Sequence, residues 1–121
     1  MTVSGPSFIS LQVRDLARSA AFYEAYLGFE RQDGPPAAVV FNTSPAAFAV
    51  REPAPGVDLD SIAQLGFGVS VWLHADGVQE IYDRMAADGV PISSAPSPSP
   101  FGLTFTFEDP DSYRITLYDR V

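Results

Sequence analysis

The sequence predicts an α+β protein made of two βαβββ modules, whose open half-barrel sheets surround a cleft. Short segments alternate apolar and polar residues, as half-buried strands do. In each half of the chain a helical pattern follows the first such segment, and further strand segments follow the helix. The order of elements repeats, with Leu11 corresponding to Leu73 and Leu16 to Val78. We expect one domain, residues 1–121, with module one over about residues 5–52, a linker over about 53–66 and module two over about 67–121.

In module one, residues 8–13 alternate and predict a strand with Ile9, Leu11 and Val13 on its buried side. Asp15 is a favourable N-cap for a helix over Leu16–Leu27, and Gly28 stands where a left-handed cap ends a helix. Three further strand segments are expected, over residues 29–31, 38–41 and 48–50, the last two joined by a turn over residues 42–45.

In module two, residues 68–74 alternate and predict a strand. Asp76 is expected to cap a helix over Val78–Ala87, which Gly89 ends. A short strand is expected near residues 91–93, and the serine- and proline-rich residues 93–100 predict a loop.

The chain closes with an antiparallel hairpin, formed by residues 104–107 and 114–118. Pro110 presets the backbone for a type I turn, and the Asp109 side chain can accept hydrogen bonds from the turn amides. One face of the second strand is aliphatic and needs a covering helix. The other face carries polar and aromatic side chains, on which a ligand could lie.

Composition narrows the classes of function. The net charge is −8, and all seven basic residues are arginines, so Schiff-base chemistry on lysine is excluded and binding to nucleic acid is disfavoured. The chain has no cysteine, so it has no thiolate metal site or thiol nucleophile. No apolar run approaches the roughly 20 residues of a membrane helix, and no signal-peptide pattern is present. We therefore expect a cytoplasmic protein with no nucleic-acid or membrane partner.

Two motifs resemble the signatures of the vicinal oxygen chelate superfamily, which includes glyoxalase I, extradiol dioxygenases and bleomycin-resistance proteins. The N-terminal motif is Ile9-Ser10-Leu11-Gln12-Val13-Arg14-Asp15-Leu16, then Ser19, Phe22-Tyr23 and Leu27-Gly28-Phe29. The C-terminal motif is Phe101-Gly102, Phe105, Phe107, Asp109-Pro110-Asp111, Ile115 and Leu117. The resemblance implies the paired-module fold, but not one activity, because the family hosts unrelated chemistries.

The resemblance also implies four positions at which enzymes of the family hold a divalent metal. In this sequence they fall on Phe8, Ser70, Thr116 and, on or near it, Ala49. None of these is a usual ligand for a catalytic divalent ion, so we expect no metal and no other cofactor. Ser112 stands where the family usually has glycine, which predicts a slightly strained turn.

The predicted ligand-binding face is aromatic, with a few hydroxyls, one amide and one guanidinium, and suits a large planar ligand. Ala49 and Phe105 are further candidates, and core packing is an alternative role for Phe8, Phe105 and Phe107. The candidate ligand-binding residues are Phe8, Ser10, Gln12, Phe41, Phe48, Ser70, Trp72, His74, Phe101, Arg114, Thr116 and Tyr118.

The chain is most similar to metal-free, bleomycin-resistance-like members. The resemblance implies that these form homodimers with two clefts at the subunit interface and bind an antibiotic unchanged, and we expect the same assembly here. The leading hypothesis is therefore antibiotic resistance by sequestration of a bulky aromatic natural product, without catalytic residues. The alternative is a metal-independent isomerase or cyclase using His74 or Arg114. A metal enzyme with ligands elsewhere and a ligand sensor stay open as well.

Overall fold

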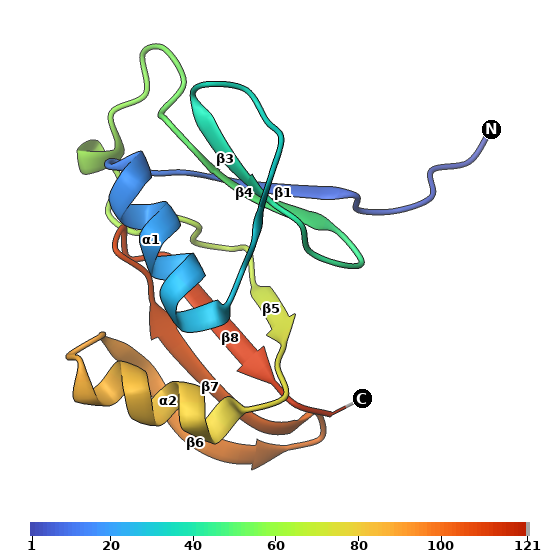
Figure 1. The fold of residues 1–121 in the computed structure, drawn as a ribbon, viewed down its shortest axis with the longest axis vertical. Helices are drawn as coiled ribbons and strands as arrows, with labels where there is room; N and C mark the ends of the chain where they lie inside the picture. Colours follow the sequence, from blue (N-terminus) through green and yellow to red (C-terminus); the bar gives the residue numbers. More distant parts are fainter. Residues whose placement is uncertain (121) are drawn as a thin grey trace. The chain divides into compact units, whose positions relative to one another are not determined.

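The computed structural model describes residues 1–120 and divides the chain into two compact units, Met1–Ser61 and Ile62–Val121. We call these units module one and module two. Each contains a helix followed and preceded by strands of one open, four-stranded mixed sheet (Figure 1). The predicted α+β architecture of two βαβββ modules with sheets not closed into barrels is confirmed.

The sheet of module one has the strand order β1-β4-β3-β2. β1 and β4 are parallel, whereas the other neighbours are antiparallel. A short 3-10 helix, η1, closes the module. The elements are β1 (Phe8–Gln12), α1 (Leu16–Leu27), β2 (Arg31–Gln32), β3 (Ala38–Phe41), β4 (Ala47–Arg51) and η1 (Leu59–Ser61).

Helix α1 begins and ends at the residues that the sequence predicts. The side chain of Asp15 accepts a hydrogen bond from the Arg18 backbone N–H at 3.1 Å, which satisfies one of the free donors of the first turn. Gly28 adopts a left-handed conformation with φ of 68° and its N–H donates to the Glu24 carbonyl. Both ends of α1 are therefore fixed by local chemistry.

Four aromatic side chains fill the space between α1 and the sheet of module one. Tyr23, on the buried side of α1, lies 5.1 Å from Phe48 and 6.3 Å from Phe41 between ring centroids, and Phe29 contacts all three. Phe41 and Phe48 are fully buried in this cluster. Strand parity therefore places these two candidate residues on the helix side of the sheet.

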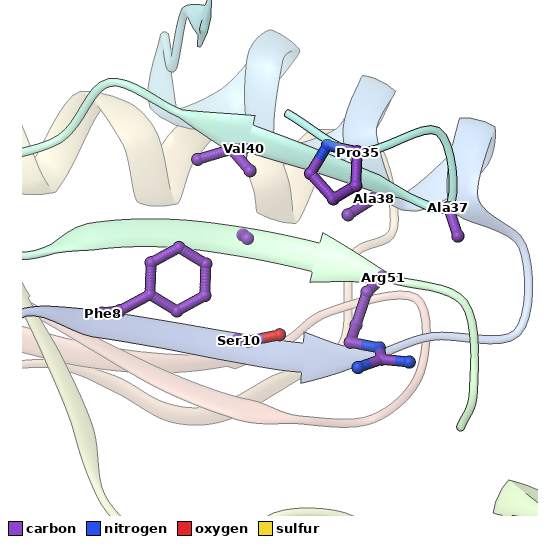
Figure 2. A pocket seen from close by; sticks show the side chains of 8 residues that line it. Phe8, Ser10, Pro35, Ala37, Ala38, Val40 and Arg51 are labelled. Atoms are coloured by element: carbon purple, nitrogen blue, oxygen red, sulfur yellow. The ribbon is translucent and has the colours of Figure 1, made fainter. Parts of the chain in front are cut away.

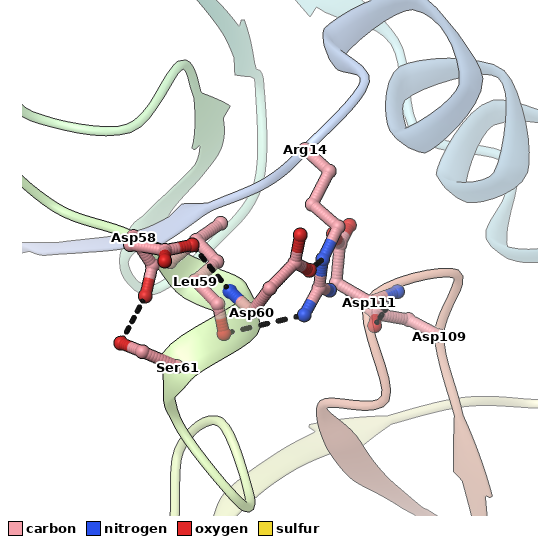
Figure 3. A network of polar contacts seen from close by, with 7 residues as sticks. All are labelled: Arg14, Asp58, Leu59, Asp60, Ser61, Asp109 and Asp111. Atoms are coloured by element: carbon pink, nitrogen blue, oxygen red, sulfur yellow. Dashed lines mark hydrogen bonds and ion pairs between the residues drawn. The ribbon is translucent and has the colours of Figure 1, made fainter.

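Polar contacts hold the segment that contains η1 (Figure 3). Arg14 pairs with Asp60 at 2.6 Å and donates to the Leu59 carbonyl, while Asp58 accepts a hydrogen bond from the Asp60 backbone N–H. Leu59 is buried, so η1 is anchored by one apolar side chain and by this network. The segment was predicted to be a linker, and η1 was not predicted within it.

The sheet of module two has the corresponding order, β5-β8-β7-β6, with β5 and β8 parallel. Phe105, Phe107, Ile115 and Leu117 are buried on the face that α2 covers, together with Met85 of the helix. The elements are β5 (Val71–His74), α2 (Val78–Ala87), β6 (Ile92–Ser99), β7 (Gly102–Glu108) and β8 (Arg114–Tyr118).

The loop predicted over residues 93–100 is wrong, because β6 runs from Ile92 to Ser99. β6 is an edge strand that pairs with β7 alone, and its register shifts twice along the pairing. Prolines are tolerated on edge strands and at bulges, since a missing N–H there need not break a ladder. Pro96 lies within the second register shift and Pro98 on the same edge strand, so both fit this rule. The serine- and proline-rich composition concealed the strand.

Helix α2 has the predicted bounds but not the predicted N-cap. Gly77, rather than Asp76, occupies the cap position, and no side chain caps the helix there. Gly89 follows the helix with φ of 80°, as expected for a residue that ends a helix. Neither helix in the described part of the chain is long and apolar enough to cross a membrane.

The turn between β7 and β8 is closed as predicted. The Ser112 N–H donates to the Asp109 carbonyl, and the Asp109 carboxylate accepts from the Tyr113 N–H at 2.9 Å. The same carboxylate accepts from the Asp111 N–H at 2.9 Å (Figure 3). Ser112 has φ of 69°, a conformation that glycine adopts more easily. The strain that the family resemblance implied at this position is therefore present.

Candidate ligand-binding site

Each sheet has one face under its helix and one face turned away from it, which we call the open face. On module one, the pairing register sets which side chains share the open face. Phe8 lies beside Ala47, Ser10 beside Ala49, and Ala49 beside Val40. The open face of module one therefore carries Phe8, Ser10, Gln12, Ala38, Val40, Ala47, Ala49 and Arg51.

The open face of module one is hollowed into a pocket of about 310 Å³ (Figure 2). Its floor is low because the central row consists of the small side chains Ser10 and Ala49 with Val40 beside them. Phe8 and Arg51 stand at its ends. The lining residues are Phe8, Ser10, Pro35, Ala37, Ala38, Val40, Ala49 and Arg51.

The segment between β2 and β3 forms one wall of this pocket. It passes so close to Val40 that a Cβ atom on Gly34 would come within 2.8 Å of a Val40 methyl group. Pro35 and Ala37 follow and reach the pocket itself. The wall therefore depends on a glycine that allows close approach and on a proline that stiffens the chain.

Two polar side chains, at the C-terminal ends of β1 and β4, are held by hydrogen bonds to the backbone. The Gln12 side-chain oxygen accepts a hydrogen bond from the Ala54 N–H at 2.7 Å. Arg51 Nε donates to the Glu52 carbonyl at 2.9 Å, which orients the guanidinium. Gln12 thus positions the chain after β4, and Arg51 presents its remaining donors at the end of the pocket.

The open face of module two carries larger and more polar side chains. Trp72 lies beside Thr116, His74 beside Tyr118, and Thr116 beside Thr106 in the pairing register. These side chains alternate with the buried ones beneath α2. The open face of module two therefore carries Trp72, His74, Thr104, Thr106, Glu108, Arg114, Thr116 and Tyr118.

Trp72 is the centre of an aromatic group on this face. Its ring lies 5.4 Å from that of Phe101, edge-on, and 6.0 Å from that of Tyr118, and the His74 ring lies 5.5 Å from Tyr118. Trp72 is 45% exposed and Phe101 53% exposed. We call Trp72, Phe101 and Tyr118 the aromatic platform. Exposed aromatic rings that contact one another offer flat apolar faces to a ligand.

Hydroxyl groups lie next to the aromatic platform. The Thr106 and Thr116 hydroxyls are 2.6 Å apart and share a hydrogen bond. His74 Nε2 lies 3.3 Å from the Asp119 carbonyl, and Arg114 is exposed beside Glu108 in the register. This face can therefore combine ring stacking with hydrogen bonds to a polar edge of a ligand.

Phe101 is positioned by contacts that were not predicted. The Phe101 N–H donates to Ser99 Oγ at 3.0 Å, and the Leu103 N–H donates to Asp119 Oδ1 at 2.8 Å. Gly102 has φ of 86°, and a Cβ there would collide with Asp119. Only the Phe101-Gly102 pair carried a signal for this arrangement in the sequence.

All but one of the predicted candidates fall into three groups in the structure. Phe8 and Ser10 line the pocket of module one, and Gln12 lies on the same open face with its side-chain oxygen bonded to the backbone. Trp72, His74, Arg114, Thr116 and Tyr118 share the open face of module two, and Phe101 contacts Trp72. The third group is Phe41 and Phe48, which are buried under α1, while Ser70 precedes β5 and is exposed.

The residues that line the pocket but were missed are Pro35, Ala37, Ala38, Val40 and Arg51. Arg51 could have been found, because it continues the alternation of residues 47–49 and lies one position beyond the predicted end of the strand. Pro35 was recognised as a chain break, but nothing in the sequence indicates that its ring reaches a sheet face.

The side chains at the four metal-ligand positions that the resemblance implies do not fit a divalent metal. The implied ligand positions are Phe8, Ala49, Ser70 and Thr116, and the Thr116 hydroxyl is already bonded to Thr106. Within residues 1–120 no three histidine, cysteine or acidic side chains come together as a metal site. Divalent metals are bound mainly through imidazole, thiolate or carboxylate groups, none of which occurs at these four positions.

The chain belongs to the Glyoxalase/Bleomycin resistance protein/Dioxygenase superfamily, whose model matches residues 5–117. This match confirms the resemblance of the two motifs and includes both modules. No curated protein matches the sequence.

Solved structures with the same fold include proteins of different activity. The fosfomycin resistance protein FosX from Listeria monocytogenes has a TM-score of 0.76 and 22% identity over 99% of this chain and 96% of its own. TnmS3, an antibiotic binding protein from Streptomyces sp. CB03234, has a TM-score of 0.73 and 22% identity over 100% and 99%. A lactoylglutathione lyase from Agrobacterium tumefaciens has a TM-score of 0.70 and 20% identity over 98% and 96%. These similarities show the fold. The activity must be inferred from the site residues, because one fold hosts many activities.

Proposed function

We propose that this protein binds a bulky, planar aromatic natural product and holds it without chemical change, giving antibiotic resistance by sequestration. The observation that carries the proposal is the aromatic platform, where Trp72 and Phe101 are half-exposed and in contact on an open sheet face. Large aromatic side chains grouped on a surface usually mark a binding site.

The energetics favour a flat ligand. A ring stacked on Trp72 or Tyr118 gains about 0.5–1.5 kcal/mol per aromatic pair beyond the burial of apolar area. The hydroxyls of Thr106 and Thr116 beside the rings can bond to a polar edge and fix its orientation. On module one, the pocket of about 310 Å³ is near the lower end of the range for small-molecule sites and accepts one ring system.

The residues also support binding over catalysis. The positions at which the family's enzymes hold their metal carry Phe8, Ala49, Ser70 and Thr116, so these side chains supply no acid, base or ligand that activates a substrate. Sequestration needs none, because the protein lowers the concentration of free antibiotic by stoichiometric binding. TnmS3, an antibiotic binding protein, and FosX, a fosfomycin resistance protein, are precedents in this fold for antibiotic binding and for antibiotic resistance.

The proposal is tested by titrating purified protein with polycyclic aromatic antibiotics, anthraquinones among them, and following tryptophan fluorescence. Trp72 is the single tryptophan, so quenching reports on the aromatic platform. We expect saturable quenching at a fixed stoichiometry and recovery of the ligand with unchanged mass and chromatographic retention. Absence of quenching across the panel, or recovery of a chemically altered ligand, would reject sequestration.

A second candidate function is a metal-independent isomerase or cyclase that acts on an aromatic substrate. It is favoured by one observation, the edge-on contact of the His74 ring with Tyr118 on the same open face as Trp72. Turnover in buffer containing a chelator, lost in His74→Ala and in His74→Gln but kept in the surface control Arg18→Gln, would identify this function.

The proposal includes a homodimer located in the cytoplasm. Exposed apolar side chains at Ile62, Phe67 and Val69, and the edge strands of both open sheets, are surfaces that pairing of two chains can cover. A cytoplasmic location lets the protein meet an antibiotic before its target does. Light scattering at micromolar concentration, with a mass of two chains expected, tests the dimer, and cell fractionation tests the location.

A further inference from the structure

The pocket on module one has one charged lining residue, Arg51. The other lining residues are apolar except for Ser10. Phe8, which is 54% exposed, stands at one end, and Arg51 stands at the other end with the Ser10 hydroxyl between them (Figure 2). The pocket therefore runs from an aromatic end at Phe8 to a cationic end at Arg51. Phe8 pairs with Ala47, and Arg51 lies on the same face of β4 two alternate positions further along.

The Arg51 guanidinium is oriented but keeps most of its donors. Its Nε donates to the Glu52 carbonyl, which uses one of five N–H groups. Arg51 forms no ion pair with any residue in the described part of the chain, whereas Arg14 pairs with Asp60 and Arg31 with Glu24. The two terminal nitrogens can therefore bind a planar pair of oxygens bidentately.

The charge of the whole protein makes this arginine distinctive. A net charge of −8 repels an anionic ligand at long range. A pocket for a neutral ligand would not need a cation at one end. The charge of that cation must stay partly solvated when it has no anionic partner. An oriented guanidinium beside an apolar pocket instead provides a local partner for a negative group that the overall field disfavours.

We propose that the pocket of module one selects an aromatic ring system bearing a carboxylate or an ionised phenol, with Arg51 as its anchor. This inference rests on the proposed function and names the ligand class that the pocket of module one takes. The ring lies over the floor of Ala49 and Val40 against Pro35, and the anionic oxygens point to Arg51 and Ser10. Arg51 acts as a specificity-determining residue and takes no part in any chemical step.

The test compares two probes of the same shape, 2-naphthoate and its neutral amide 2-naphthamide, by isothermal calorimetry and ligand-observed NMR. We expect the unmodified protein to bind the carboxylate about ten- to hundredfold more tightly than the amide, the effect of a charge-assisted, bidentate contact. Arg51→Gln should remove this preference and leave the affinity for the amide nearly unchanged. Arg51→Lys should keep part of it, since lysine retains the charge but not the fork.

Arg18→Gln is the matched control, because it removes the same charge from an exposed position on α1. It should leave the preference for the carboxylate intact. Equal affinities of the two probes for the unmodified protein, or equal losses in Arg51→Gln and Arg18→Gln, would overturn the inference and leave aromatic binding standing. Failure of both probes to bind, together with no quenching by the antibiotic panel, would overturn the inference and the proposed function together.

Discussion

The two modules share one order of strands but use the open faces of their sheets differently. Module one buries its aromatic cluster, Tyr23, Phe29, Phe41 and Phe48, beneath α1 and keeps small side chains on the open face. Module two also buries Phe105 and Phe107, but it places the aromatic platform on the open face. One open face is therefore hollow with a cationic end, and the other carries partly exposed aromatic rings.

The difference shows how two sheets with the same strand order can carry different surfaces. On β1 and β5, Ser10 corresponds to Trp72 and Gln12 to His74, while Phe8 corresponds to Ser70, which precedes β5. Ser10 forms part of the pocket floor in module one, whereas the indole of Trp72 at the corresponding position of module two offers a surface for stacking. The two sheets nevertheless have the same order of strands. In the proposed function, the open-face residues contact the ligand, whereas the buried helix-side residues stabilise each module.

The largest expected effect is on stability, from Phe41→Ala. Phe41 is fully buried in the aromatic cluster of module one, so its truncation leaves a cavity and should lower the free energy of unfolding by about 3–5 kcal/mol. Urea denaturation measures this change. Phe8→Ala, on the open face of the same sheet, should cost less than about 1 kcal/mol. Equal losses in the free energy of unfolding for the two variants would contradict the distinction between the helix side and the open face.

The next effect is on binding, from Trp72→Ala. Loss of the indole should weaken binding of a polycyclic aromatic ligand about tenfold or more, because stacking and buried apolar area are lost together. Calorimetry measures the affinity without relying on the tryptophan signal. Trp72→Phe should restore most of the affinity. If Trp72→Ala changed neither the affinity nor the stability, the proposal that the aromatic platform of module two contacts the ligand would be wrong.

The third effect concerns the helix N-termini, which differ between the modules. Asp15→Ala removes the capping side chain of α1 and should destabilise the protein by about 1 kcal/mol. Gly77→Ser adds a side-chain cap to α2 and should stabilise by a few tenths of a kcal/mol, since only the flexible end of Glu80 must move aside. Thermal and urea unfolding compare the two variants, and a loss of stability in Gly77→Ser would contradict this assignment.

The smallest effect is electrostatic and confined to the surface of module one. The Arg31 guanidinium, hydrogen-bonded to Glu24 at 2.8 Å, lowers the pKa of that carboxyl, and Glu24 in turn raises the pKa of Arg31. A carboxyl with a lowered pKa stabilises the fold above its unfolded-state pKa, and this contribution is lost as the pH falls through the folded-state pKa. The solvent-exposed pair should contribute little to stability.

Carbon-detected NMR titration of Glu24 measures this effect directly. Arg31→Gln should return the Glu24 pKa toward its ordinary range while the midpoint of urea unfolding at neutral pH stays within error. A Glu24 pKa that does not move in this variant would show that Arg31 is not the cause of the shift.

Much of the fold could be predicted because local signals agreed with the tertiary structure. Leu16–Leu27 and Val78–Ala87 have helical periodicity and glycines at their ends, and both bounds are confirmed. β6 was missed, because its serines and prolines resemble a loop and only pairing with β7 makes it a strand. The cap of α2 was assigned one residue early, to Asp76, since composition favours aspartate where the backbone places Gly77.

The open faces were harder to predict than the fold. Trp72, Thr116 and Tyr118 alternate with aliphatic residues, so their common face follows from strand parity alone. Phe41 and Phe48 lie in strands that are apolar on both faces, and alternation could not assign them to a side. The pocket of module one also needs Pro35, whose approach to the sheet is a property of chain packing and not of any local pattern.

The most direct test of the account is an NMR titration of nitrogen-labelled protein with a polycyclic aromatic antibiotic that quenches Trp72. The account predicts that the largest shifts fall on open-face residues, with the Trp72 indole N–H among them, while the signals of the ligand itself keep their identity throughout. Shifts confined to the helix-side residues Tyr23 and Phe105, or the growth of new ligand signals over time, would contradict it.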